Sequence, residues 1–205
     1  MIISNREEVI DKAFRVFLRM NYEKASLKML SNACGTVRTG VTYYFPHKLD
    51  LFIAVADKYV IKLQSPSNKF AKPADSLAEF IMQYVDGVKK AMENVKELVI
   101  SSGEEVNECC PNFHYFHFLF QVRMYYPGVR EKMEGIFRQE YEMWKRVIQH
   151  AIDSGEIKKD TDVEKTAALF RQIFLGMSYE ESFFDGLNVN TLKEKFDYLY
   201  SMLKA

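Results

Sequence analysis

The stretch from residue 33 to residue 48, which reads ACGTVRTGVTYYFPHK, has side chains suited to contacting DNA. Arginine and threonine donate hydrogen bonds to base edges and phosphates, and glycine allows close approach to a backbone. If this stretch is helical, Val41 points inward and a thin polar face points outward. We predict that this face contacts DNA, although tight packing explains the glycine equally well. Its members are Arg38, Thr39, Gly40 and Thr42.

Two tyrosines follow this polar face directly. A tyrosine has an apolar ring and a polar tip, so Tyr43 or Tyr44 can donate its hydroxyl to a phosphate while the ring packs on the protein. We predict DNA contact for both. For each tyrosine, a purely structural role in the core is the alternative.

Three helices are predicted to hold this face in position. Apolar residues at helical spacing predict an amphipathic helix over about 6–20. Ser26 has the position of an N-cap for a short second helix that Gly35 ends, and a third helix is predicted over about 37–44. Two short helices joined by a glycine turn indicate a helix-turn-helix unit. A generic three-helix packing unit is the alternative.

The rest of the chain also has helical periodicity. Residues 65–73 form a linker-like segment, and the pairs Thr161/Glu164 and Thr191/Glu194 have capping-box spacing. Without a convincing strand pattern, we expect an all-α fold. A helix-turn-helix domain over 1–48 would precede a larger ligand-binding and dimerisation domain over 49–205. Its helices are predicted over about 49–64, 77–92, 95–106, 111–126, 129–154 and 163–184, with a last helix ending near 203.

Charge is distributed unevenly along the chain. Residues 1–48 contain eight Lys and Arg against four acids, 8 − 4 = +4, whereas the whole chain has no net charge. A modestly basic N-terminal segment is compatible with a polyanionic partner. An ordinary solvated surface explains the same charge equally well.

Several other classes of protein are disfavoured. The apolar runs are too short for a membrane span, and acidic residues come before any long apolar run at the N-terminus. Three cysteines, two of them adjacent, do not resemble a secreted disulfide framework. We therefore expect a cytoplasmic protein with no membrane partner.

Metal-binding side chains occur, but without a recognisable pattern. No further ligand completes a familiar spacing around Cys109, Cys110, His114 and His117. The sequence has no phosphate-binding glycine loop, HExxH motif or nucleophile elbow. We expect no metal, no cofactor and no enzymatic activity, and leave a redox role of these residues open.

The N-terminal segment resembles the tetracycline-repressor (TetR) family of bacterial transcriptional regulators. The similarity runs without a gap from Val9 to Lys48, through VIDKAFRVF, NYEKAS, LKMLSNACG and TYYFPHK. Departures lie in the reading helix, where Thr42 replaces a frequent aromatic, Tyr44 a common histidine, and Thr39-Gly40 a frequent Gly-Thr. The resemblance implies that Ser26, Lys28 and Lys48 contact the DNA backbone.

A single helix-turn-helix unit reads few base pairs, so DNA-binding proteins of this kind usually pair about a two-fold axis. Two apolar stripes near the C-terminus are suited to pairing, and the resemblance favours a homodimer. Burial of both stripes inside one subunit is the alternative. The predicted interface residues are Phe170, Phe174, Met177, Phe196, Leu199 and Leu203.

Aromatic residues concentrated between 113 and 126 suggest an apolar pocket for a small-molecule effector. Aromatic residues at helical spacing can equally be ordinary core. The predicted pocket residues are Tyr84, Met92, Phe113, Phe116, Phe120, Met124 and Trp144.

These features lead to one main hypothesis and two alternatives. The chain is expected to be a homodimeric repressor that a small-molecule effector releases from a palindromic double-stranded operator. The first alternative is an all-α ligand-binding or protein-interaction module with a degenerate helix-turn-helix. A cofactor-free enzyme is the second, although no motif supports it.

Overall fold

The computed structural model describes residues 5–65, 74–100 and 111–205. Throughout these ranges helices are joined by turns, and the one β-type pairing is an isolated bridge between Ile157 and Lys204. The all-α prediction is confirmed. In chain order the helices are α1 (Arg6–Arg19), α2 (Leu27–Cys34), α3 (Arg38–Tyr44), α4 (Lys48–Ala56), the π-helix η1 (Asp57–Lys62), α6 (Leu77–Ile100), α7 (Pro111–Tyr125), α8 (Val129–Asp153), α9 (Val163–Glu181) and α10 (Val189–Leu203).

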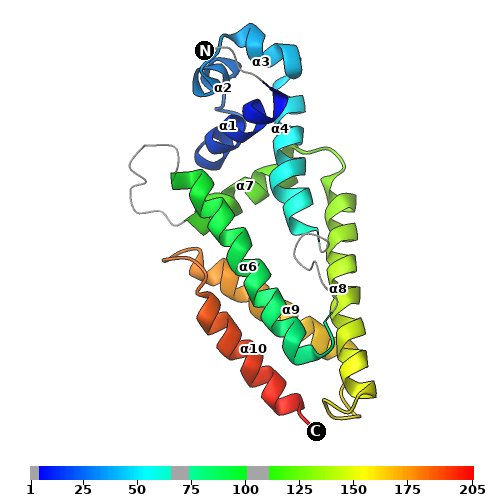
Figure 1. Cartoon of the computed structure of the whole chain (residues 1–205). Helices are drawn as coiled ribbons and strands as arrows, with labels where there is room; N and C mark the ends of the chain where they lie inside the picture. Colours follow the sequence, from blue (N-terminus) through cyan, green and yellow to red (C-terminus); the bar gives the residue numbers. More distant parts are fainter. Residues whose placement is uncertain (1–4, 66–73, 101–110) are drawn as a thin grey trace.

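Three parts of the molecule follow one another along its length (Figure 1). The head comprises α1–α3, and α2 and α3 lie at the end farthest from the C-terminus. The strut, α4 with η1, leads away from the head. The body comprises α6–α10. Within the described ranges, no helix combines the length and apolar character that a membrane span needs.

Local capping explains where the head helices begin and end. The Asn5 side chain accepts a hydrogen bond of 2.8 Å from the Glu8 amide at the start of α1. Ser26 accepts one of 3.2 Å from the Met29 amide at the start of α2, as predicted. Gly35 ends α2 with a φ of 69°, in the left-handed region that favours glycine.

The capping residues predicted for the last two helices are wrong. The N-cap of α9 is Asp162 rather than Thr161, and its side chain accepts from the Lys165 amide at 3.0 Å. The N-cap of α10 is Asn188 rather than Thr191, and its side chain accepts from the amides of Asn190 and Thr191. Because Asp and Asn cap at least as well as Thr, an earlier or adjacent Asx residue took the role.

Two predicted helix boundaries also differ. The patterns expected over 77–92 and 95–106 form one helix, α6, as far as Ile100, and residues 101–106 lie outside the described ranges. Helix α9 ends at Glu181 rather than near 184, because the chain turns before Gly186, whose φ is 90°.

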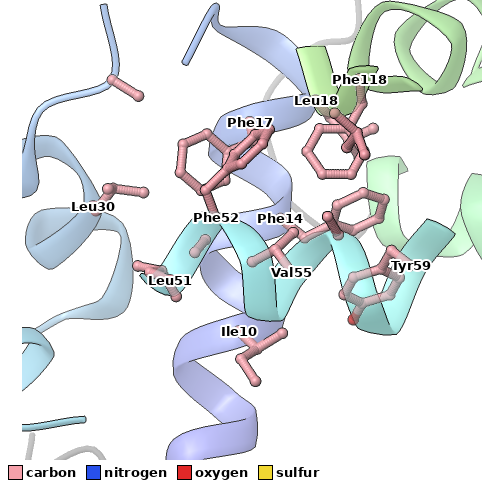
Figure 2. Close-up of a cluster of buried hydrophobic side chains, with 14 of the residues drawn as sticks. Ile10, Phe14, Phe17, Leu18, Leu30, Leu51, Phe52, Val55, Tyr59 and Phe118 are labelled. Atoms are coloured by element: carbon pink, nitrogen blue, oxygen red, sulfur yellow. The ribbon is translucent and has the colours of Figure 1, made fainter. Parts of the chain in front are cut away.

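The first hydrophobic core joins the head, the strut and part of the body (Figure 2). Phe14 on α1 stacks on Tyr59 of the strut with ring centroids 3.8 Å apart, and Phe118 on α7 meets Phe14 edge-on at 5.2 Å. Phe17 and Phe52 make a further edge-on contact at 5.1 Å. The domain boundary predicted after residue 48 therefore falls inside a shared core, and it stays a prediction.

The second core lies within the body, between α6, α8, α9 and α10. Trp144 is fully buried there and stacks on Phe170, with centroids 4.7 Å apart and planes 8° from parallel. Tyr84 is also fully buried and donates a hydrogen bond of 2.9 Å to Glu140. Burial first, and then the neighbouring carboxylate, raises the pKa of Tyr84 well above its ordinary value.

Candidate nucleic-acid interface and ligand cavity

Helix α3 presents polar and aromatic side chains at the outer end of the head. Val41 is fully buried and anchors the helix, while Arg38 and Thr39 are exposed. Tyr43 is 81% exposed, and its ring meets that of Tyr44 edge-on at 5.0 Å. Such a helix, fixed by one buried residue and lined with donors, has the form that enters a major groove.

The two tyrosines have different surroundings. Tyr44 is half-buried and packs against the first core, whereas Tyr43 extends into solvent. Tyr43 is therefore the better placed of the two to contact a phosphate, and the ring of Tyr44 has a structural role.

Gly40 packs against Thr36, just before α3, and Thr42 hydrogen-bonds within α3. A Cβ on Gly40 would lie 2.3 Å from Oγ1 of Thr36, closer than any real Cβ contact allows. The Thr42 hydroxyl lies 3.2 Å from the carbonyl of Arg38 and 3.4 Å from that of Thr39, so it can donate to either. Packing against Thr36 is thus sufficient to explain the glycine.

The three residues predicted to contact the DNA backbone differ in exposure and in hydrogen bonding. Lys28 is exposed, whereas the Ser26 hydroxyl caps α2. The Lys48 ammonium donates to the Tyr22 carbonyl at 2.8 Å and lies 4.2 Å from the centre of the Tyr22 ring. Burial lowers the pKa of Lys48, although nearby Glu23 opposes the change. Lys48 therefore fastens the strut to the link after α1.

Sequence reasoning missed Val37 as a candidate contact. It is the N-cap of α3, makes no side-chain capping bond, and is 70% exposed beside Arg38. The valine side chain has no atom that can accept a capping hydrogen bond, so a valine at an N-cap position indicates a role other than capping. An exposed methyl group at the start of a reading helix can contact the methyl group of thymine.

Side chains from α7 hydrogen-bond to backbone groups at the C-terminal end of α1. The Gln121 side chain accepts from the Tyr22 amide at 2.6 Å and donates to the Phe17 carbonyl at 3.0 Å. Nδ1 of His114 lies 3.2 Å from the Leu18 carbonyl, which can only accept, so Nδ1 carries the proton. These bonds satisfy carbonyls that a helix end leaves without partners. We call Gln121 and His114 the α7 clasp.

The strut is fastened to both neighbouring parts. Towards the head, the Tyr59 hydroxyl donates to Asp11 at 2.6 Å, and the Lys58 ammonium contacts the same carboxylate. Towards the body, the Tyr126 hydroxyl donates to Asp57 at 2.7 Å. Burial, followed by the Asp11 hydrogen bond, raises the pKa of Tyr59. The strut therefore has side-chain hydrogen bonds to both the head and the body.

A cavity of about 240 Å³ lies between the end of the strut and the body helices. Tyr115 connects its wall to the strut, because its hydroxyl accepts from Gln64 at 3.1 Å and donates to the Tyr59 carbonyl at 3.2 Å. The wall is formed by Leu63, Gln64, Val88, Ala91, Met92, Val95, Asn112, Tyr115, Phe116, Leu119, Met133, Phe137, Phe174, Leu175, Ser178 and Leu187.

The predicted pocket residues are distributed over three environments. Met92 and Phe116 line the cavity. Tyr84 and Trp144 belong to the second core instead. The exposed residues are Phe113, Phe120 and Met124, which are 40%, 59% and 70% accessible.

Most of the predicted dimer residues face the interior of the subunit. Phe170, Met177, Phe196 and Leu199 are buried in the second core, and Phe174 and Leu203 pack against it. The same two helices expose a different apolar set, and the sequence already places Leu169, Tyr198 and Met202 off the two stripes. Its members are Leu169, Leu175, Tyr179, Tyr198 and Met202, with Phe183 and Phe184 just after α9.

The remaining candidate metal ligands lie only partly within the described residues. Cys109 and Cys110 lie outside the described residues, whereas His114 and His117 face the end of α1. No group of three or more potential metal ligands occurs in the part of the chain that the structure describes.

Both halves of the chain match known families. Residues 9–55 match the model of the bacterial regulatory proteins of the tetR family, and residues 115–185 match that of the tetracyclin repressor-like C-terminal domain. The chain belongs to the TetR family. Like other TetR proteins, it is a DNA-binding transcriptional regulator and not an enzyme.

Individual similar proteins are distant in sequence, but the similarity covers nearly the whole chain. The HTH-type transcriptional regulator AcrR of Shigella flexneri is 20% identical over 97% of this chain and 87% of its own length. A putative regulator from Saccharomonospora viridis, solved with choline, has a TM-score of 0.62 at 16% identity, covering 96% of this chain and 95% of that one.

A second solved structure shares the fold. NalD, the secondary repressor of the MexAB-OprM multidrug efflux pump in Pseudomonas aeruginosa, has a TM-score of 0.56 at 14% identity. The similarity covers 97% of this chain and 95% of NalD. At these identities the solved structures support the fold of the TetR chain and no shared ligand.

Proposed function

We propose that this TetR protein is a homodimeric repressor that leaves a palindromic operator when a small molecule occupies the cavity of each subunit. The position of Tyr115 carries the proposal, because it lines the cavity and hydrogen-bonds to the strut. A ligand can bias the orientation of the heads only by binding one arrangement better than the other. Such a regulator would work in the cytoplasm, with DNA binding assigned to residues 1–48 and ligand binding and pairing to residues 49–205.

DNA contacts are divided between reading and positioning. Arg38, Thr39 and Val37 are exposed at the start of α3, where side chains reach base edges. Tyr43 and Lys28 are exposed donors suited to phosphates. The remaining predicted contacts are assigned supporting roles in the head, through the caps, hydrogen bonds and packing described above. These residues are Ser26, Gly40, Thr42, Tyr44 and Lys48.

Pairing is assigned to the exposed faces of α9 and α10. Leu169, Tyr179 and Tyr198 are 46%, 52% and 68% exposed, which is unusual for large apolar side chains on two neighbouring helices. Nothing lies within 4 Å of a Cβ on Gly176, so a partner helix could approach there. A palindromic site requires two heads, and a two-fold interface formed by these faces would supply them.

Selection from random double-stranded DNA, followed by fluorescence anisotropy on the enriched sequence, tests the DNA-binding part. We expect a palindrome, and Arg38→Ala should weaken binding about tenfold or more, as loss of a base-reading arginine does. Arg146→Ala, an exposed arginine on α8, is the matched control and should bind normally. If no sequence is enriched, the all-α module with a degenerate helix-turn-helix becomes the better account.

A further inference from the structure

We propose that the cavity binds an uncharged, mainly apolar molecule with one hydrogen-bonding group, and that Ser178 recognises this group. The inference rests on the proposed function in taking this cavity as the effector site. It goes further in assigning the chemical class of the ligand and the residue that selects it.

Ser178 is an unusual member of the cavity wall. The residue is 8% exposed, and its hydroxyl oxygen is buried without a hydrogen-bond partner. Serine within a helix normally donates back to a carbonyl one turn earlier, and buried hydroxyls are nearly always paired. Because Ser178 is a wall residue, a ligand oxygen or NH group in the cavity is the partner that its hydroxyl lacks.

Two of the other polar side chains of the wall are already hydrogen-bonded. Gln64 and Tyr115 bond to each other, and the Tyr115 hydroxyl also donates to the Tyr59 carbonyl. Asn112 lies beside Gly186, within 3.4 Å of the position that a Cβ would occupy. Among the described wall residues, Ser178 on α9 thus has a buried hydroxyl without a partner, whereas Gln64 and Tyr115 are already hydrogen-bonded.

Among the described residues that line the cavity, none carries a charge. A charged ligand would lose its hydration there without gaining a counter-ion. The basic side chains of Lys58 and Lys62 line a neighbouring groove, which shares Leu63 and Val95 with the cavity wall. The Arg171 guanidinium lies 5.7 Å from the ring centre of Phe137, but Arg171 is not among the wall residues. This arrangement disfavours both anions and cations.

Apolar side chains determine the remaining properties of the ligand. Phe116, Phe137 and Phe174 offer ring faces and edges, while Met92 and Met133 are flexible enough to adapt to an irregular shape. A cavity of about 240 Å³ accommodates a small bicyclic or short-chain molecule. The chemistry points to a compact neutral alcohol, phenol or ketone.

Four probes with one naphthalene scaffold test the assignment by isothermal titration calorimetry on the full chain. They are 2-naphthol, naphthalene, 2-naphthoate and 2-naphthylmethylammonium. We expect 2-naphthol to bind about tenfold or more tightly than either charged probe. Equal or tighter binding of a charged probe, or no binding of either neutral probe, would overturn the proposal.

Variants separate the role of Ser178 from that of the cavity. Ser178→Ala should weaken 2-naphthol binding about threefold to tenfold and leave naphthalene binding unchanged, because it removes one hydrogen bond. Ala91→Phe should fill the cavity and weaken both neutral probes, whereas Ser154→Ala, at an exposed position after α8, should affect neither. Equal loss of both neutral probes in Ser178→Ala would exclude specific recognition by the hydroxyl.

Operator binding is measured separately, with and without 2-naphthol. If 2-naphthol binds as expected but leaves operator affinity unchanged, the cavity assignment stands and the proposed effector mechanism fails. If the enriched operator is released by a charged probe that binds more tightly, the mechanism stands and the neutral-ligand assignment fails.

Discussion

The Tyr22 amide, in the link after α1, donates a hydrogen bond of 2.6 Å to the side chain of Gln121 on α7. The same carboxamide donates to the Phe17 carbonyl, and Gln121 is only 3% exposed. A body helix thus completes the end of a head helix. Because α7 also lines the cavity through Tyr115 and Phe116, one helix contacts both the ligand site and the head.

Gln121→Met tests the strength of this connection. The substitution keeps the volume but leaves the Tyr22 amide and the Phe17 carbonyl without their partner, so we expect unfolding free energy to fall by about 1–3 kcal/mol. Urea unfolding of the full chain measures it. Gln149→Met, at an exposed position on α8, should change stability by no more than about 0.5 kcal/mol. Equal losses in the two variants would show that the hydrogen bonds of Gln121 contribute nothing to stability.

The contact of His114 with the end of α1 is expected to make the stability of the protein depend on pH. Burial is the main cause that lowers the pKa of His114; Arg19 and His117 add to it, and the Leu18 carbonyl opposes it. In the unfolded chain the imidazole regains an ordinary pKa near about 6.5 and binds more protons than in the folded chain. Stability is therefore expected to fall as the pH falls through this value.

Urea unfolding at about pH 7.5 and about pH 5.5 measures this dependence. His114→Asn keeps a donor for the Leu18 carbonyl but does not titrate, so its stability should fall less between the two conditions. His150→Asn, at an exposed position on α8, should behave like the unmodified chain. If His114→Asn and the unmodified chain lose the same stability, His114 is not the responsible group.

Gly40 offers a test that separates packing from DNA contact. Gly40→Ala should destabilise the protein by about 1 kcal/mol, because the new methyl group collides with Thr36 and outweighs the better helix propensity of alanine. After Thr36→Ala, the same substitution should be neutral or stabilising. A double-mutant cycle by urea unfolding gives the coupling, and simple additivity would contradict the packing explanation. Normal operator affinity of the double variant would also exclude a need for glycine at the DNA backbone.

Periodicity and capping predicted much of the fold because they depend on nearby residues. Ser26 and Gly35 define the ends of α2 through bonds within a few residues, and the structure has both. The partner of a buried face depends on residues far along the chain. The stripe containing Phe170 is indeed buried, but against Trp144 and Phe196 of the same subunit.

Helix α7 shows the same limit for the ligand site. Its aromatic residues surround the helix, so no single face stands out in the sequence. Phe116 lines the cavity, Phe118 is fully buried in the first core, and Phe120 is 59% exposed. Gln121 could not be predicted either, because its partners are backbone groups about a hundred positions away in the chain.

The exposed face of α9 and α10 gives the last prediction, which concerns pairing. In a two-fold interface each substituted residue faces the same surface of its partner, so a carboxylate at Leu169 or Tyr198 would be buried against apolar groups in both copies. We expect Leu169→Glu and Tyr198→Glu to convert a dimer into a monomer in size-exclusion chromatography with light scattering, and to weaken binding to a full palindrome. Met124→Glu, which is 70% exposed on α7, should remain dimeric. Thermal unfolding checks that each variant is folded. If Leu169→Glu and Tyr198→Glu both remain dimers, the interface lies elsewhere on the protein.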